Sequence, residues 1–194
     1  MASYASEPRQ DISGARDRFF ESASEFTPLV AVDSKDARFL VSTADEAVGR
    51  RLFRRGRRGE MVTLGHAVSI LEAVGLGHWA RGTTFLDLGA NVGTSAITAL
   101  LAHEFQAAIA CEPEPENHRL LRVNAAMNDL DDRLLALQVA VSNSRGVANL
   151  ALDPLNSGGH QLLNETKDRE TMAVETVSVD YLVERGIIDP EEVG

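Results

Sequence analysis

The stretch TTFLDLGANVGT, residues 83–94, decides the fold of this chain. It joins a short apolar run to a turn that contains Gly89 and Gly93, and apolar side chains then recur at helical spacing up to His103. Glycine lets the backbone turn tightly and leaves room for a ligand, while the start of the next helix offers free N–H groups. The stretch therefore predicts a strand, a glycine turn and a helix.

Two further strands are predicted downstream. Residues 107–111 are apolar on both faces, as a buried parallel strand is, and a helix is predicted from about Pro115. Residues 134–141 are predicted to form the third strand. The alternation of strands and helices predicts an α/β fold, a doubly wound parallel sheet with right-handed crossovers.

Two carboxylates lie where such a sheet binds its ligand. The carboxyl ends of the strands carry Asp87, the glycine turn and Glu112, and ligands of these folds bind at that edge. Glu112 comes 19 positions after Gly93, the spacing of an acidic residue that accepts hydrogen bonds from ribose hydroxyls. The pattern therefore predicts a ligand that contains a nucleoside.

The turn also indicates which nucleoside is bound. Asn91 stands where the dinucleotide fingerprint has its second glycine, which disfavours a pyrophosphate and makes an NAD-dependent oxidoreductase the weaker hypothesis. Asp87 would suit the ammonium group of a methionine moiety, which favours S-adenosylmethionine. The alternative interpretation is that Asp87 and Glu112 only cap strands and that the glycines only turn the chain.

Several motifs then occur in the order of one known family. They are Phe85–Thr94, Cys111–Asn117, Leu120–Asn124, Val139–Ser142, Ser157–His160 and Val174–Leu182. Together they resemble the successive motifs of the FkbM-type S-adenosylmethionine-dependent methyltransferases. The clear resemblance covers residues 83–182, and a vaguer one extends back to Phe39–Asp45.

The resemblance implies a Rossmann-like fold of the class I methyltransferase type and a cofactor, S-adenosylmethionine. It implies O-methylation of a hydroxyl on a small molecule or saccharide. Glu112 would hold the ribose hydroxyls, and Ala140 and Val141 would lie near the adenine. The other residues of the implied cofactor site are Asp87, Gly89, Ala90, Asn91, Gly93 and Pro113.

Candidates for a catalytic base are few. His160, in a glycine-bearing loop near the predicted site, could remove a hydroxyl proton near neutral pH, although a lone loop histidine is more often polar surface. Cys111 precedes Glu112 in a buried strand without a positioned histidine, so we interpret it as a packing residue. Asn124 and Asn128 on the second helix are expected to satisfy backbone groups.

Composition limits the remaining possibilities. The 194 residues suit one soluble domain, and no apolar run is long enough for a membrane helix or a signal peptide, so we expect a cytoplasmic protein without a membrane partner. The single cysteine excludes an internal disulfide and a cysteine-based zinc cluster, and no metal site is predicted. The net charge of −10 disfavours a nucleic-acid partner.

The charge is unevenly distributed along the chain. Residues 1–80 contain 11 basic and 11 acidic side chains, so the whole net charge of −10 lies in residues 81–194. Residues 1–28 are expected to form a leader, poorly ordered or partly helical, and residues 29–80 a hairpin and helical lead-in. Six arginines occupy nine positions in Arg50–Arg58, either as a clamp for a phosphorylated or acidic partner or as a solvated helix end.

The C-terminal part, residues 81–194, is predicted to be the first part of the methyltransferase domain. Members of the family continue with a fourth parallel strand that ends in Asp-x-Glu-Gly and with three more strands, and this sequence ends before them. We therefore expect an unpaired edge on the first strand, open to a complementary chain or a second copy. The alternative function is a truncated, non-catalytic remnant or interaction module that keeps a nucleoside-binding fold.

Overall fold

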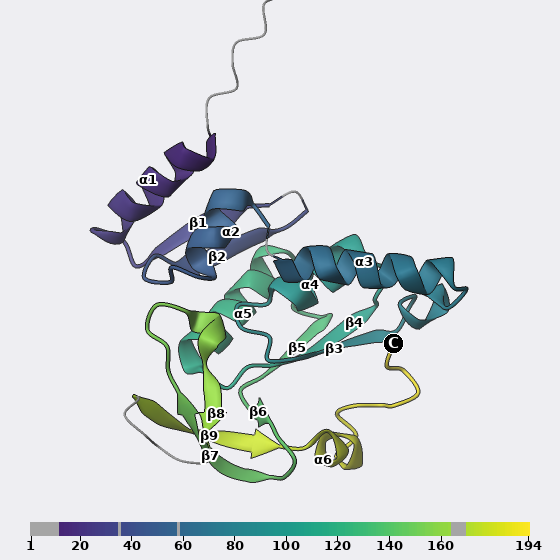
Figure 1. Cartoon of the computed structure of the whole chain (residues 1–194). Helices are drawn as coiled ribbons and strands as arrows, with labels where there is room; N and C mark the ends of the chain where they lie inside the picture. The colour runs from purple at the N-terminus through teal and green to yellow at the C-terminus, as the bar shows by residue number, and fades with distance from the viewer. Residues whose placement is uncertain (1–11, 35, 58, 164–169) are drawn as a thin grey trace, which may run out of the picture.

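A hairpin and four helices precede the parallel sheet (Figure 1). The computed structural model describes residues 12–34, 36–57, 59–163 and 170–194, so the first part of the leader, residues 1–11, lies outside it. The predicted hairpin is confirmed, because β1 (Leu29–Asp33) pairs antiparallel with β2 (Arg38–Ser42). The helices around it are α1 (Ile12–Ser24), α2 (Gly49–Arg55), α3 (Gly59–Ala73) and the 3-10 helix η1 (Gly77–Trp79).

A three-stranded parallel sheet forms the centre of the molecule. Its strands lie in the order β3 (Thr84–Leu88), β4 (Ala107–Cys111) and β5 (Leu134–Leu137). The crossovers run through α4 (Thr94–Ala102) and α5 (Pro115–Met127). This arrangement confirms the predicted α/β fold, with strand, glycine turn and helix where the sequence places them.

The two faces of the sheet are covered differently. Ala108 and Ala110 of β4 belong to the core that includes residues of α4 and α5. Ile109 and Cys111 point to the opposite face and pack in a second cluster with Leu182 of α6 (Val179–Glu184). Burial raises the pKa of the Cys111 thiol to about 11, which agrees with a packing role for this residue.

A second sheet adjoins the first, and it changes the predicted third strand. Its order is β6 (Ala140–Val141), β9 (Thr171–Val177), β7 (Gly146–Ala151) and β8 (Gln161–Leu163). The prediction of one strand over residues 134–141 was wrong, because β5 ends at Leu137 and Ala140–Val141 pairs parallel with β9. There Ala140 is buried beside Leu150 and Val174. An apolar run alone does not specify which sheet it joins.

The free side of β3 is paired at its start. Thr84 forms a parallel bridge with Val193, its N–H donates to the Glu192 carbonyl over 2.7 Å, and the Gly194 N–H donates to the Thr84 carbonyl over 3.3 Å. The expectation of an unpaired edge was therefore wrong at this position. In the part of the chain that the structure describes, Phe85–Leu88 pairs with β4 alone.

Asparagines of α5 attach the hairpin to the sheet domain. The Leu40 N–H donates to Asn124 Oδ1 over 2.6 Å, and Asn124 Nδ2 donates to the carbonyls of Leu40 and Val92. Asn128 makes the same pair of contacts with the backbone of Arg38. Both asparagines thus satisfy backbone groups, as predicted. The division into residues 1–28, 29–80 and 81–194 stays a prediction.

None of the described helices is both long and apolar enough to span a membrane. No group of three or more His, Cys, Asp or Glu side chains is arranged to hold a metal ion in the described ranges.

Candidate cofactor site

The glycine turn after β3 needs its glycines. Gly89 and Gly93 adopt φ values of 117° and 89°, where other residues are strained. A Cβ on Gly93 would also lie 2.6 Å from Leu121 Cδ1. The N–H groups of Gly89 and Ala90 both donate to the Cys111 carbonyl over 2.9 Å, which fixes the turn against the end of β4.

Glu112 follows β4 and lies directly against this turn. Its side chain is buried, with Oε2 accepting from the Asn91 N–H over 2.7 Å and Oε1 from the Glu114 N–H over 3.0 Å. Burial raises the pKa of Glu112, while the two backbone donors act in the opposite direction. A carboxylate has about four acceptor positions, so the two N–H groups and the side chain of Asn117 orient it and leave acceptor capacity for ribose hydroxyls.

Asp87 lies at the other side of the turn. Its Oδ2 accepts from the Ala96 N–H over 3.1 Å, in the first turn of α4. Burial raises the pKa of Asp87 to about 6, and the negative charge of Glu60 adds to the rise. Asp87 therefore caps a helix, whereas the alternative interpretation holds that it only caps a strand, and its ionised form would be stabilised by a cation.

A hollow of about 180 Å³ lies over the turn and Glu112. The predicted cofactor residues that line it are Gly89, Asn91, Glu112, Pro113, Ala140 and Val141. Asp87, Ala90 and Gly93 are not among its lining residues. The structure therefore brings together the residues that are predicted to contact the ribose and the adenine. Ala140 and Val141 line the same hollow although they belong to the second sheet.

The loop Ser157–His160 closes this hollow, and the sequence prediction did not assign Ser157 to the site. Asn91 Nδ2 donates to Ser157 Oγ over 3.1 Å, and Asn117 Nδ2 donates to the Ser157 carbonyl over 3.2 Å. The Ser157 hydroxyl in turn donates to Asp45 Oδ2 over 2.5 Å. The conspicuous SGGH motif was the available signal, because consecutive glycines permit a close approach of the backbone.

Asp45 extends this hydrogen-bond network to the lead-in, residues 29–80. It is buried, and its second oxygen, Oδ1, accepts from the N–H groups of Ala47 and Val48 just before α2. A continuous chain of hydrogen bonds therefore leads from α2 through Asp45, Ser157 and Asn91 to Glu112.

His160 lies between two hollows. It lines the one over Glu112 and an adjoining one of about 320 Å³, which also contains Asp45, Glu114 and Asp153. His160 Nδ1 accepts from the Asp153 N–H over 3.0 Å, so the neutral ring carries its proton on Nε2. In this arrangement the ring can donate a hydrogen bond into the hollows, and it can act as a base only when Nδ1 is released from the Asp153 N–H.

Parallel strands, a glycine turn and a buried acidic residue after the second strand define a nucleoside-binding α/β domain. Comparison with family models identifies the particular family: the methyltransferase FkbM domain matches residues 87–193, so the chain belongs to that family. The family confirms the resemblance seen in the motifs, and with it the class of S-adenosylmethionine-dependent methyltransferases. No curated protein matches the sequence.

Solved structures show more distant similarity. Trm5 of Methanocaldococcus jannaschii in complex with adenosine is 19% identical, with a TM-score of 0.40 over 56% of this chain and 28% of that one. Trm5b of Pyrococcus abyssi is 16% identical, with a TM-score of 0.42 over 61% and 32%. TYW2 of P. horikoshii in complex with MeSAdo is 14% identical, with a TM-score of 0.44 over 68% and 50%. The chain thus spans half or less of each of these structures.

Proposed function

We propose that the protein is an S-adenosylmethionine-dependent methyltransferase that methylates a hydroxyl of a small molecule or saccharide. The observation that carries this proposal is the pair Asp87 and Glu112, two carboxylates at the ends of adjacent parallel strands with the glycine turn between them. Family membership supports the same activity. We extend the proposal to a cytoplasmic location, where the single cysteine stays reduced.

Each carboxylate suits a different part of the cofactor. Glu112 is oriented by backbone donors and faces the hollow, which suits two ribose hydroxyls. Burial raises the pKa of Asp87, because the ionised carboxylate is poorly solvated there. An ammonium group beside it would stabilise the ionised form. Ala140, Val141, Leu150 and Leu162 give the hollow an apolar wall that suits an adenine ring.

When bound, S-adenosylmethionine supplies an electrophilic methyl group on a sulfonium. The protein then has to align the acceptor oxygen with that group and exclude water, because positioning alone lowers the barrier of such displacements substantially. His160 is the proposed proton acceptor, and it would have to give up its bond from Asp153 to free a ring nitrogen.

Calorimetric titration with S-adenosylhomocysteine tests the cofactor assignment. We expect saturable binding by the chain, and ligand at a hundredfold over Kd should raise the free energy of unfolding by about 2.7 kcal/mol. Glu112→Ala should abolish binding, whereas the exposed Glu116→Ala, which removes the same charge from an ion pair with Arg119, should leave it intact. Binding of NAD in place of S-adenosylhomocysteine would overturn the assignment.

The activity needs its own measurement. Transfer of labelled methyl groups from S-adenosylmethionine to a panel of hydroxylated acceptors would support a methyltransferase. Cofactor binding without transfer by the full-length protein to any acceptor of the panel would favour the non-catalytic module.

A further inference from the structure

The arginine cluster, the arginines of residues 50–58, contains side chains that form ion pairs and side chains that do not. Arg50 pairs with Asp17 over 2.8 Å and with Glu46 over 2.7 Å, and it also contacts Glu21. Arg54 reaches the same Asp17 over 3.3 Å. The Arg50 guanidinium is the main cause that lowers the pKa of Asp17. These two arginines hold α1 against α2, so part of the cluster has a structural role.

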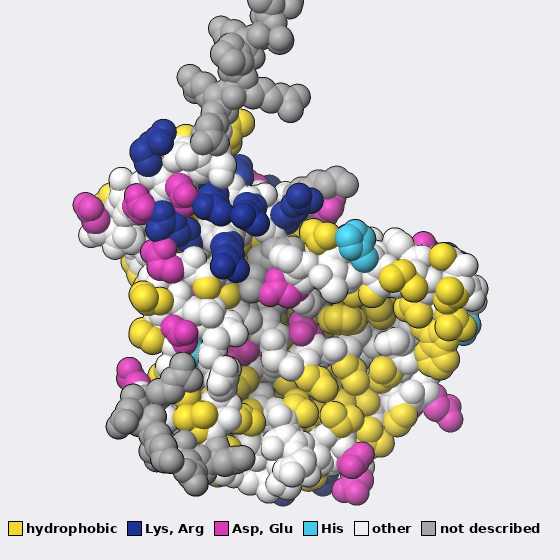
Figure 2. All heavy atoms as spheres, viewed as in Figure 1, with side chains coloured by type: hydrophobic (Ala, Val, Ile, Leu, Met, Phe, Trp, Pro, Cys, Tyr) yellow, Lys and Arg dark blue, Asp and Glu magenta, His cyan; other side chains and the backbone are white. Residues whose placement is uncertain are grey.

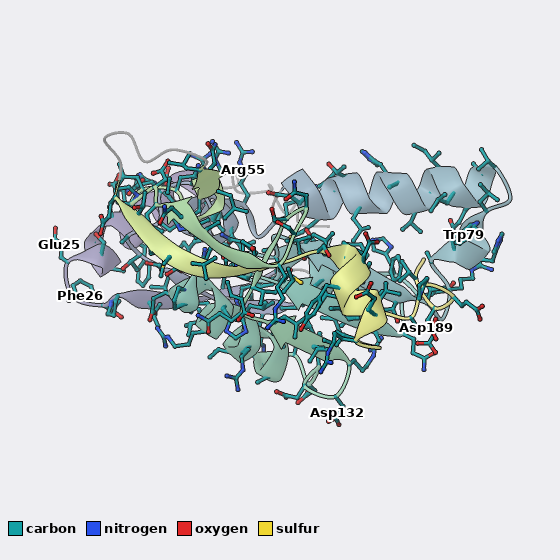
Figure 3. The ribbon with its side chains drawn as sticks, turned by 90° about the horizontal axis from the view of Figure 1, so that it is seen from below. Glu25, Phe26, Arg55, Trp79, Asp132 and Asp189 are labelled. Atoms are coloured by element: carbon teal, nitrogen blue, oxygen red, sulfur yellow. The ribbon has the colours of Figure 1, made fainter. Side chains whose placement is uncertain are left out.

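Arg55 and Arg57 are exposed and have no ion-pair partner in the described part of the chain. Gly56, at a φ of 64°, ends α2 between them and turns the chain. Both side chains line a hollow of about 520 Å³, together with Ser13, Arg54, Gly59 and Val62. Figure 2 shows basic side chains gathered on this part of the surface, and Figure 3 places Arg55 near the beginning of α3.

The hollow is linked to Asp87 through the beginning of α3. Its wall includes Gly59, the first residue of α3, and the next residue, Glu60, is close enough for its charge to raise the pKa of Asp87. Met61 packs against the core that contains Ala90 of the glycine turn. Under the proposed function, Asp87 holds the methionine end of the cofactor, which is the end that carries the methyl group.

We propose that Arg55 and Arg57 bind a phosphate group on the methyl acceptor, which makes the substrate a phosphorylated small molecule. Guanidinium groups bind phosphate oxygens bidentately, and two unneutralised arginines match the charge of a phosphate monoester. The described lining of the hollow contains three arginines and no acidic side chain, so an anion would be attracted there. The proposal rests on the proposed function for the identity of the acceptor, and the phosphate site itself does not require it.

Titration with inorganic phosphate at low ionic strength, without cofactor, tests the site. We expect Arg55→Ala/Arg57→Ala to raise the Kd for phosphate at least tenfold. The matched control is Arg18→Ala/Arg51→Ala, which removes the same charge from exposed positions on α1 and α2 outside the hollow and should change the Kd less than twofold. Unchanged melting temperatures of both variants would show that each is folded.

Three outcomes would overturn the proposal. They are no phosphate binding by the unmodified chain, equal loss in both double variants, and binding of a single-stranded RNA oligonucleotide without binding of phosphate. The result is separable from the proposed function, because S-adenosylhomocysteine binding is measured independently. Retained cofactor binding with failed phosphate binding would reject this site alone.

Discussion

The hydroxyl of Ser157 donates a hydrogen bond of 2.5 Å to the carboxylate of Asp45, although 112 residues separate them in the chain. The same hydroxyl accepts from Asn91 in the glycine turn. One serine therefore joins the lead-in, the turn and the loop over the nucleoside hollow. The shape of that hollow therefore depends on a residue that lies far from the glycine turn in sequence.

Replacing Ser157 should weaken cofactor binding without removing it. Ser157→Ala removes one donor to a buried carboxylate, and we expect a loss of about 1–3 kcal/mol in the free energy of unfolding. The Kd for S-adenosylhomocysteine should rise about three- to tenfold, as expected for one net hydrogen bond. Calorimetry and chemical denaturation measure the two effects. Ser144→Ala, at an exposed serine, is the control, and equal behaviour of the two variants would contradict this role.

Asp87 should make both stability and binding depend on pH. The pKa of Asp87 in the folded chain is about 6, against an ordinary value of 3.8, so the folded state holds an extra proton between these pH values. The stabilising contribution of the protonated group is complete below pH 3.8 and is lost as the pH rises through 6. Cofactor affinity should change in the opposite direction, because the ammonium needs the ionised carboxylate.

Asp87→Asn separates these effects. The amide oxygen can still accept from the Ala96 N–H, so the variant should be at least as stable as the unmodified chain at pH 7 and should lack this part of the pH dependence. It should bind S-adenosylhomocysteine much more weakly at pH 7. Denaturation and calorimetry between pH 4.5 and 7.5, about 1.5 units on each side of the titration, measure both. If the exposed control Asp132→Asn gave the same profile, the assignment to Asp87 would fail.

Asn124 should be the most costly polar residue to remove. It is fully buried, and Asn124→Ala leaves the N–H and carbonyl of Leu40 and the carbonyl of Val92 without this partner. We expect a loss of about 2–4 kcal/mol in the free energy of unfolding. Asn128→Ala, at a less buried position with similar contacts, should cost about 1 kcal/mol, because water can replace the amide. A smaller effect at Asn124 than at Asn128 would contradict the attachment of the hairpin through α5.

Alanine substitution should change the free energy of unfolding in opposite directions at Gly93 and Gly65. Gly93→Ala combines a φ of 89° with a contact of 2.6 Å to Leu121 and should destabilise by about 1–3 kcal/mol. Gly65→Ala lies inside α3 with its nearest neighbouring atom at 3.8 Å and should stabilise by about 0.5–1 kcal/mol. Thermal unfolding of both variants checks the pair, and a neutral Gly93→Ala would show that the turn relaxes.

The sequence was sufficient to predict the central sheet and one side of the site. Local periodicity and spacing identify strand, turn and helix, and they place Asp87 and Glu112 at the same edge because parallel strands end together. The departure of Ala140 and Val141 into the second sheet was not predictable in this way, because it depends on apolar partners far along the chain. The contact between Ser157 and Asp45 was not predictable either, because no local sequence pattern encodes the pairing of two loops.

The two asparagines of α5 also protect the hairpin from other chains. An exposed strand edge offers alternating N–H and carbonyl groups, and such a row recruits further strands in aggregation. On β2, the groups of Arg38 and Leu40 that face away from β1 are already bonded to Asn128 and Asn124. The end of α5 thus takes the place that a neighbouring strand would occupy beside β2, and the side chains that attach the hairpin also prevent β-augmentation at this edge.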